Sequence, residues 1–315
     1  MAIIKLILFI IILTEAIFMS SKPLVSIVIP CYNHEKFVKD TIQSVIDQTY
    51  LNIELIIIDD GSTDSSVSII EEMIEQCEQR FVRFKFKNRS NKGLSATLNE
   101  AIVWCEGEYY SALASDDIIF KDKTQIQVEL LSENKNIVAV HGGVILINDN
   151  NEEGDTWISE TRVYSFKDII LHEHNLPAPT QMARLESIKK AGCYDPNIII
   201  EDWYMLLKLS EFGDILYIDH FFAYYRQHDS NMSKNMLKIH QGRLEVIACF
   251  KNSKHYQKAF HNIKWINANE KYKDDQRYQL GYLQATFLIK PLKVSNVFFK
   301  YFTRVIKNKL RAAFK

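Results

Sequence analysis

The residues best placed to do chemistry are two carboxylates, Asp116 and Asp117, at the end of the apolar stretch 109–114. The stretch is too short for a helix and rich in residues that suit a pleated surface, so it predicts a buried strand. Ligands of open α/β sheets collect outside the carboxyl ends of the strands, and carboxylate oxygens are ligands for divalent cations. The pair could instead cap a helix predicted to start near Asp122, or line a solvated turn.

The first half of the chain alternates strands and helices at short, regular intervals. This alternation predicts a right-handed, doubly wound sheet of mostly parallel strands with flanking helices, that is, a Rossmann-like α/β fold. The apolar runs are short and nearly continuous, as expected for strands buried on both faces. The predicted elements are, in chain order, strand 25–29, helix 35–48, strand 53–58, a helix beginning near residue 65, strand 81–87, helix 94–105 and strand 109–114.

Polar side chains follow three of these strands at the point where each strand ends. Because the carboxyl ends of parallel strands meet at one edge of a sheet, we expect these side chains to lie along the same edge. The arrangement suits a nucleotide whose base and ribose lie over the early strands and whose diphosphate reaches a metal at the later one. No G-x-G-x-x-G or P-loop pattern occurs in this half of the chain. The side chains are Tyr32 and Asn33, Asp59 and Asp60, and Asp116 and Asp117.

Four segments resemble, in the same order, the motifs of glycosyltransferase family 2, the inverting GT-A enzymes. The resemblance covers about residues 23–235. It implies a GT-A fold, a nucleotide-sugar donor, a divalent cation (Mn²⁺ or Mg²⁺) and inversion at the anomeric carbon. The segments are VSIVIPCYN at 25–33, IIDDGSTD at 57–64, NKGLSATLN at 91–99 and ASDD at 114–117.

The resemblance assigns the donor site residue by residue. Pro30, Tyr32 and Asp60 correspond to contacts with the nucleobase and ribose, with Asp60 reading the base, and Lys92 falls close to a basic residue near the donor. Asp59 could instead do no more than satisfy the backbone amides of its turn. The predicted donor-binding residues are Pro30, Tyr32, Asn33, Asp59, Asp60, Lys92 and Asp116.

The resemblance also places a metal site. Residues 115–117 correspond to the family's D-x-D motif, with Asp117 as the direct ligand and Asp116 beside it. Ser115 stands at the first acidic position of the motif, so the sequence leaves open which of the two carboxylates contacts the metal. His228 lies in a segment similar to an Arg-x-His loop that closes over the diphosphate, and it is the third candidate ligand; a lone histidine is, however, often not a ligand.

Glu201 and Asp202 resemble the family's Glu-Asp motif, whose carboxylate is the catalytic base. A sugar hydroxyl is a poor nucleophile until a carboxylate within hydrogen-bond reach takes its proton. The resemblance therefore predicts Asp202 as the base, with Glu201 beside it, at the start of a helix running through Glu211. The alternative is that both are ordinary acids at a helix N-terminus, which the helix dipole favours.

Composition narrows the class of protein. The chain has 315 residues, 47% of them apolar and 24% charged, as in a folded globular protein, and its net charge of −1 gives no case for nucleic acid as a partner. Its five cysteines show no C-x-x-C spacing, which argues against a disulfide framework or a zinc site and favours a reducing, cytoplasmic location.

The two ends of the chain differ from its middle. Residues 1–22 form an apolar leader, either a weak anchor or a segment upstream of a true start at Met19. Residues 236–315 are predicted to be a helical extension, and the last thirty contain six Lys, two Arg and no acid. A basic amphipathic helix is typical of a protein on an anionic membrane surface, although a solvated helix packing one face on the domain would also fit.

These observations predict an inverting, metal-dependent glycosyltransferase that uses a nucleotide-sugar, a UDP-sugar, as donor. The acceptor would be a hydroxyl of a lipid-linked saccharide or surface polysaccharide such as O-antigen or capsule, met at the inner face of the cytoplasmic membrane. Residues 23–120 would be the nucleotide-sugar half and residues 121–235 the acceptor half. The alternative is a non-catalytic nucleotide- or carbohydrate-binding subunit of a polysaccharide assembly complex.

Overall fold

The structure, a computed structural model, describes residues 22–229 and 231–274. The predictions for the apolar leader and the basic tail therefore fall almost entirely outside the described residues. The chain divides into two compact units: residues up to Phe166 with His174–Lys234, and Lys167–Glu173 with the residues from Asn235 on. Within the described ranges, no helix is both long and apolar enough to cross a bilayer.

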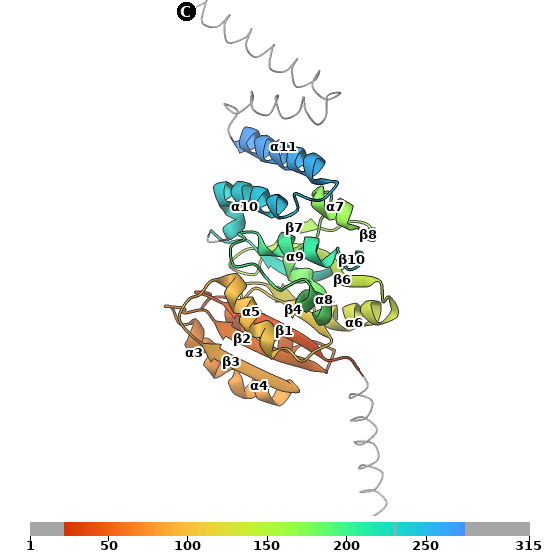
Figure 1. The fold of residues 1–315 in the computed structure, drawn as a ribbon. Helices are drawn as coiled ribbons and strands as arrows, with labels where there is room; N and C mark the ends of the chain where they lie inside the picture. Colours follow the sequence, from red (N-terminus) through yellow and green to blue (C-terminus); the bar gives the residue numbers. More distant parts are fainter. Residues whose placement is uncertain (1–21, 230, 275–315) are drawn as a thin grey trace, which may run out of the picture. The chain divides into compact units, whose positions relative to one another are not determined.

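The first unit is built on a mixed ten-stranded sheet (Figure 1). Strands β1, β2, β3 and β4 run parallel, and β6 runs parallel to β10; the short strand β9 joins the two sets by pairing antiparallel with both β4 and β6. The predicted fold, a mostly parallel sheet with flanking helices, is confirmed. The strands are β1 (Val25–Cys31), β2 (Ile53–Asp59), β3 (Arg83–Asn88), β4 (Tyr109–Ala112), β5 (Ile118–Ile119), β6 (Ile137–Ile147), β7 (Glu153–Trp157), β8 (Arg162–Tyr164), β9 (Met182–Arg184) and β10 (Asp214–Arg226).

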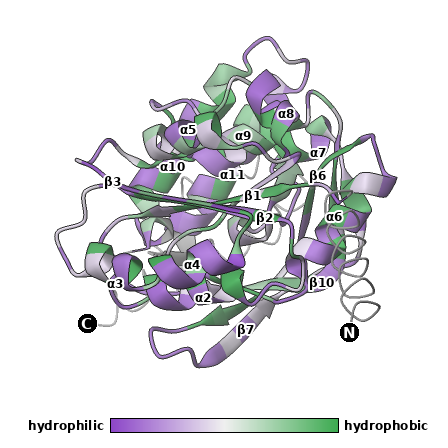
Figure 2. Ribbon diagram, turned by 90° about the horizontal axis from the view of Figure 1, so that it is seen from below, coloured by the Kyte–Doolittle hydropathy of each residue, from purple (hydrophilic) through white to green (hydrophobic). Residues whose placement is uncertain are grey.

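Helices cover the central strands. Figure 2 shows α5 on one side of β1 and β2 and α3 and α4 on the other, which explains why every residue of β2 is buried. Central parallel strands covered on both faces read as continuous apolar runs, and this is why the sequence predicts them well. The helices of this unit are α2 (Val38–Ile46), α3 (Ser66–Glu72), α4 (Ile74–Arg80), α5 (Leu94–Trp104), α6 (Lys123–Glu133), α8 (Leu185–Lys190) and α9 (Glu201–Leu209).

Two predicted helices differ from the structure. The helix expected over residues 35–48 begins only at Val38, because the amides of Phe37 and Val38 both bond to the carbonyl of His34 and form a turn first. The helix expected near residue 65 is split at Met73 into α3 and α4. Asp64 rather than Ser65 caps its start, since its Oδ1 accepts from the backbone N of Ser66 at 3.0 Å.

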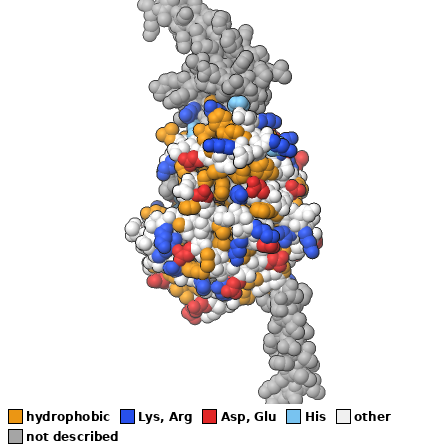
Figure 3. All heavy atoms as spheres, in the orientation of Figure 1, with side chains coloured by type: hydrophobic (Ala, Val, Ile, Leu, Met, Phe, Trp, Pro, Cys, Tyr) orange, Lys and Arg blue, Asp and Glu red, His pale blue; other side chains and the backbone are white. Residues whose placement is uncertain are grey.

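The second unit is helical, as predicted for the C-terminal extension. Helices α10 (Met236–Cys249) and α11 (Tyr256–Asp274) pack against each other. The Arg243 guanidinium pairs with the Glu270 carboxylate at 2.6 Å, and His240 bonds to the same carboxylate at 2.9 Å. On the face shown in Figure 3, basic and acidic side chains are interspersed, in keeping with the near-zero net charge.

Candidate functional site

The carboxyl ends of the central strands meet at one edge, as the sequence predicts. In the β1–β2 ladder the last residue of β1, Cys31, lies opposite the last residue of β2, Asp59. On the other side of β1, Val28 lies opposite Ala112 of β4. The loops after all three strands therefore leave the sheet side by side.

Asp59 and Asn33 hold these loops in place. The buried Asp59 carboxylate accepts from the backbone N of Gly61 at 3.1 Å, and from both the backbone N and the hydroxyl of Ser62, at 2.9 and 2.5 Å. The Asn33 side-chain oxygen accepts from the backbone N of Thr63 at 2.8 Å. These bonds are what we expect if Asp59 does no more than satisfy the backbone amides of its turn. A donor contact by either residue stays a prediction.

Asp60 ties the turn after β2 to the start of α5. Its carboxylate pairs with the guanidinium of Arg89 and accepts from the backbone N of Lys92 at 2.8 Å and of Gly93 at 2.9 Å. Arg89 in turn bonds to Thr97 on α5 at 2.8 Å. A carboxylate has about four lone-pair sites, so Oδ2, which accepts one bond, retains capacity for a ligand. Asp60 is thus held rigidly at the sheet edge.

Tyr32 and Pro30 complete the predicted nucleotide surface. Tyr32 is 48% exposed, and Pro30, paired opposite Ile58, is half-buried in β1. An exposed aromatic ring beside buried, fixed polar groups is a surface on which a base can stack.

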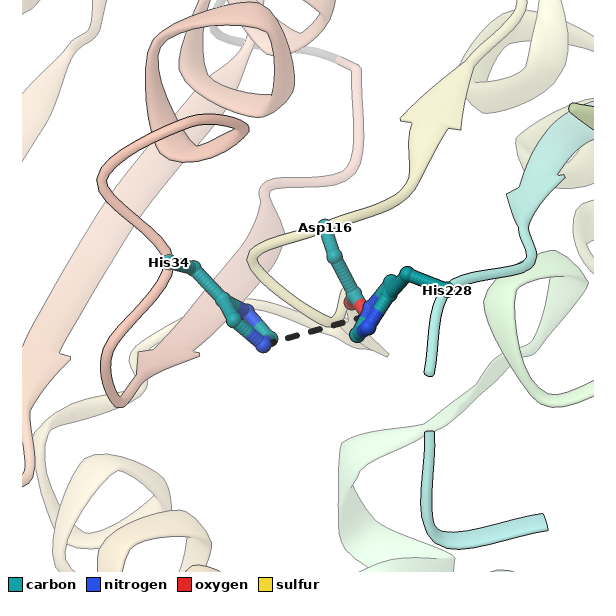
Figure 4. A group of neighbouring side chains, drawn as sticks. All are labelled: His34, Asp116 and His228. Carbon is teal, nitrogen blue, oxygen red and sulfur yellow. Dashed lines mark hydrogen bonds and ion pairs between the residues drawn. The ribbon is translucent and has the colours of Figure 1, made fainter. Parts of the chain in front are cut away.

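Three side chains that are distant in sequence converge at the same edge (Figure 4): His34, Asp116 and His228. Each offers one ligand atom, and these atoms lie within 4.8 Å of one another. His228 Nε2 bonds to Asp116 Oδ2 at 2.8 Å, and His34 Nε2 lies 4.0 Å from the same oxygen. Imidazole and carboxylate together suit a transition-metal ion, so this donor set fits the Mn²⁺ implied by the resemblance.

A shell of contacts orients these three residues. His34 Nδ1 lies 2.8 Å from the Ser115 hydroxyl, which leaves Nε2 facing Asp116. The ring of His228 stacks on the ring of Phe37, with centroids 5.2 Å apart. The Arg226 guanidinium also lies over the Phe37 ring, 4.6 Å from its centroid. Ligands held by such neighbours keep a fixed geometry for a metal.

Asp117, the predicted direct metal ligand, lies outside this group. Its carboxylate is buried and Oδ1 accepts from the backbone N of Arg226 at 2.9 Å. Arg226 also donates from Nε to the Asp116 carbonyl at 2.8 Å, so it links both aspartates to the end of β10. Burial and the neighbouring Asp116 raise the pKa of Asp117 well above its ordinary value. Whether Asp117 also binds the metal stays a prediction.

The electrostatics of His34 favour metal binding. Burial lowers its pKa below the ordinary value, more than the neighbouring Asp116 raises it. The imidazole is therefore neutral at pH 7, and a neutral imidazole has the lone pair that a metal requires.

Glu201 and Asp202 form the first turn of α9, as predicted. Asp202 Oδ1 accepts from the backbone N of Trp203 at 2.6 Å. Burial raises the pKa of Asp202, and burial together with the Asp202 carboxylate raises the pKa of Glu201 to about 8. Burial and mutual repulsion thus favour the protonated form of this adjacent pair, and the two carboxyl groups titrate together.

Glu201→Gln should therefore change how stability depends on pH. Between the pKa of an unfolded glutamate, about 4.3, and the raised value of about 8, the folded state binds more protons than the unfolded state. The free energy of unfolding then falls as pH rises through this window. From pH 5 to pH 9, the free energy of unfolding of Glu201→Gln should rise by about 1 kcal/mol or more relative to that of wild type. This is the scale of a pKa shift of one unit. Urea denaturation at both pH values measures it.

The control for this experiment is Glu71→Gln, at an exposed position on α3. Its denaturation profile should run parallel to that of wild type. Parallel profiles for Glu201→Gln as well would mean that Glu201 is an ordinary solvated acid.

Sequence reasoning missed His34 and Arg89, and it noted Arg226 only as the arginine of the Arg-x-His loop. His34 directly follows the predicted donor residue Asn33, but no spacing relates it to Asp116 or His228, which come from other strands. The arginines act through buried tertiary contacts that only the folded chain displays.

The mostly parallel sheet with flanking helices is the fold of the GT-A glycosyltransferases. The chain belongs to glycosyl transferase family 2, whose family model matches residues 26–200. An uncharacterized glycosyltransferase of Haemophilus influenzae is 40% identical over 120 residues, which are 38% of this chain and 46% of the relative. The chondroitin synthase of Escherichia coli is 29% identical over 224 residues, 69% of this chain and 31% of the synthase. The chain thus aligns with less than half of either relative.

Solved structures support the fold. TarS residues 1–349 of S. aureus superpose with a TM-score of 0.62 at 17% identity, over 87% of this chain and 83% of that one. The mannosyltransferase PcManGT of Pyrobaculum calidifontis, solved with GDP-Man and Mn²⁺, gives a TM-score of 0.60 at 14% identity over the same shares of the two chains. At these identities the likeness concerns the fold alone.

Proposed function

We propose that the protein is an inverting, metal-dependent glycosyltransferase that moves one sugar from a nucleotide, UDP, to an acceptor hydroxyl. The observation that carries the proposal is the convergence of His34, Asp116 and His228 at the sheet edge where the loops after β1 and β2 also end. A fixed carboxylate–imidazole group beside an exposed Tyr32 suits a diphosphate attached to a base. TarS has been solved with UDP-GlcNAc, and PcManGT with GDP-Man and Mn²⁺, which supports a nucleotide-sugar donor.

The nucleotide would be bound by residues that the fold already holds rigid. Tyr32 and Pro30 would contact the base, and Asp60 would hydrogen-bond the base or ribose through its remaining lone pairs. Asn33 and Asp59 would hold the loops after β1 and β2 in a fixed position relative to each other. Because these loops are cross-linked before the ligand arrives, little conformational entropy is lost on binding.

His34, Asp116 and His228 would hold the divalent cation, with Asp117 as a further carboxylate behind Asp116. The hydrogen bond between His228 and Asp116 would be exchanged for ligation. When bound, such a cation stabilises the negative charge that develops on a leaving diphosphate.

Asp202 would act as the base. Its carboxylate would take the proton of the acceptor hydroxyl as that oxygen attacks the anomeric carbon from the face opposite the leaving group. A single displacement of this kind inverts the configuration. Glu201, whose pKa is raised by burial and by the Asp202 carboxylate, would hold a proton at neutral pH and leave Asp202 ionised.

We also propose a lipid-linked or polysaccharide acceptor and a position on the inner face of the cell membrane. Both rest on the basic composition of the tail and on the similarity to the chondroitin synthase of Escherichia coli. Residues 23–120 would bind the donor and residues 121–235 the acceptor.

A thermal-shift titration against nucleotides and nucleotide-sugars, with and without Mn²⁺ or Mg²⁺, tests the donor proposal. A ligand that binds only the folded state stabilises it by an amount set by its concentration and affinity, about 2.7 kcal/mol at a hundred times Kd. We expect stabilisation that is selective for uridine nucleotides and that requires the metal. Absence of stabilisation by any nucleotide would favour the alternative, a carbohydrate-binding subunit without catalysis.

A further inference from the structure

The segment that leads into α9 determines where the proposed catalytic base lies. Residues 193–200 lie between α8 and α9 and belong to no helix or strand. In the described chain, their backbone-to-backbone hydrogen bonds run within the segment or to these two helices. Cys193 lies in the left-handed region, at a φ of 61°, which a residue other than glycine adopts at a cost. Local interactions therefore do little to fix the position of this segment.

Asn99 on α5 holds the segment through two hydrogen bonds. Its side-chain oxygen accepts from the backbone N of Tyr194 at 2.9 Å, and its side-chain nitrogen donates to the carbonyl of the same residue at 2.7 Å. Both bonds together require an amide, because a carboxylate cannot donate and an ammonium cannot accept. Asn99 is also the last residue of the segment 91–99, one of the four that resemble the family's motifs.

The same helix is fixed to the predicted donor site. Asp60 accepts from two amides directly before α5, at 2.8 and 2.9 Å. The Arg89 guanidinium, which pairs with Asp60, also bonds to α5 itself, at Thr97 and at Glu100, both at 2.8 Å. Asn99 lies between these two residues in the sequence. Helix α5 thus connects the predicted nucleobase-reading carboxylate to the segment that leads into α9.

Tyr194 lies beside the proposed base pair. Its side chain is buried, and burial raises the pKa of its hydroxyl. The carboxylates of Glu201 and Asp202 raise this pKa further, as charges close to the hydroxyl do. Asp202 is fixed to its own helix through the backbone N of Trp203. A shift of the segment before α9 would therefore move the carboxylate together with the start of the helix.

We propose that Asn99 is a positioning residue that fixes the catalytic base relative to the bound donor. The inference rests on the proposed function, in which Asp202 takes the proton of the acceptor hydroxyl. Asn99 would not touch the substrate. It would hold the backbone of Tyr194 on the helix whose N-terminal end is tied to Asp60, so that the carboxylate and the anomeric carbon keep one spacing. Since a misplacement of about 1 Å can cost about a hundredfold in rate, the contact should matter more for turnover than for donor binding.

Asn99→Ala tests the proposal, with four UDP-sugars as probes: UDP-glucose, UDP-galactose and their N-acetylamino counterparts. Alanine suits a helix, so the variant should fold. With Mn²⁺ it should bind the UDP-sugar as wild type does, measured by calorimetry, and release UDP at least about tenfold more slowly. Wild-type release by Asn99→Ala overturns the inference and leaves the proposed function intact. No release by wild type from any of the four overturns the proposed function and the inference with it.

Two further variants set the scale of the effect. Asn99→Asp keeps an acceptor for the Tyr194 amide but has no donor for the carbonyl, so it should lose less turnover than Asn99→Ala. Asn262→Ala is the control, because it makes the same change where an amide donates to the carbonyl of Leu171 in the second unit, at 3.3 Å. It should release UDP as wild type does.

A double variant shows whether Asn99 acts through Asp202. If it does, Asn99→Ala should add less than about twofold to the loss caused by Asp202→Asn, because the group that it positions is already absent. Losses that multiply in full would show that Asn99 affects turnover by another route, and would overturn the inference.

Hydrogen exchange tests the contact without any substrate. The Tyr194 amide loses its acceptor in Asn99→Ala, so peptides covering residues 192–204 should exchange at least about threefold faster than in wild type. Peptides covering β2 should be unchanged, and Asn262→Ala should leave both regions unchanged. Unchanged exchange over 192–204 in Asn99→Ala overturns the inference, because the contact then does not hold the segment.

Discussion

Asp202→Asn is expected to bind the donor as wild type does and to lose turnover by at least about a hundredfold, the usual scale for a general base. An amide cannot take the proton of the acceptor hydroxyl. It has the size of the carboxylate, however, and its oxygen can still accept from the backbone N of Trp203, as Asp202 Oδ1 does at 2.6 Å. The start of α9 should therefore keep its geometry, and the loss should appear in turnover rather than in binding or folding.

Initial rates of sugar transfer and calorimetric donor affinity measure the two effects separately. Asp214→Asn, which makes the same chemical change at the exposed start of β10, should leave both unchanged. Glu201→Gln should cost less turnover than Asp202→Asn if Glu201 is the protonated partner of the pair. An active Asp202→Asn enzyme would move the role of base to Glu201 or to another group.

The predictions from sequence succeeded where the physical cause is local. The strands β1 and β2 are short apolar runs because both of their faces are covered, and each run ends where polar loop residues begin. That end also marks the edge of a parallel sheet, so the positions of Asp60 and Asp116 at one edge followed from the pattern.

The sequence could not distinguish neighbouring residues where the cause lies in contacts between distant segments. Asp116 and Asp117 are neighbours in sequence and equivalent in composition, yet the backbone of Arg226 takes the carboxylate of Asp117 while His228 takes that of Asp116. Nothing within the segment 114–117 distinguishes them. The position of β10 at this edge distinguishes the two aspartates, and that position depends on the order of strands in the whole sheet.

This difference makes the two aspartates separable by experiment. Asp116→Asn is expected to weaken metal-dependent donor binding by at least about a hundredfold, since even partners of metal ligands contribute ten- to a hundredfold in affinity. Asp117→Asn should keep the bond from the Arg226 amide, because an amide oxygen accepts it equally well, and should lose much less. Donor titrations over a range of Mn²⁺ concentrations measure both.

Asp122→Asn is the matched control, because Asp122 also faces an imidazole, His220 at 3.3 Å, but outside the group of candidate ligands. It should bind donor and Mn²⁺ as wild type does. If Asp117→Asn instead abolishes the dependence on Mn²⁺ while Asp116→Asn retains it, the ligand is the one that the D-x-D resemblance indicates. The bond between His228 and Asp116 would then serve to position the loop after β10, and the metal would have to displace the Arg226 amide from Asp117 to bind.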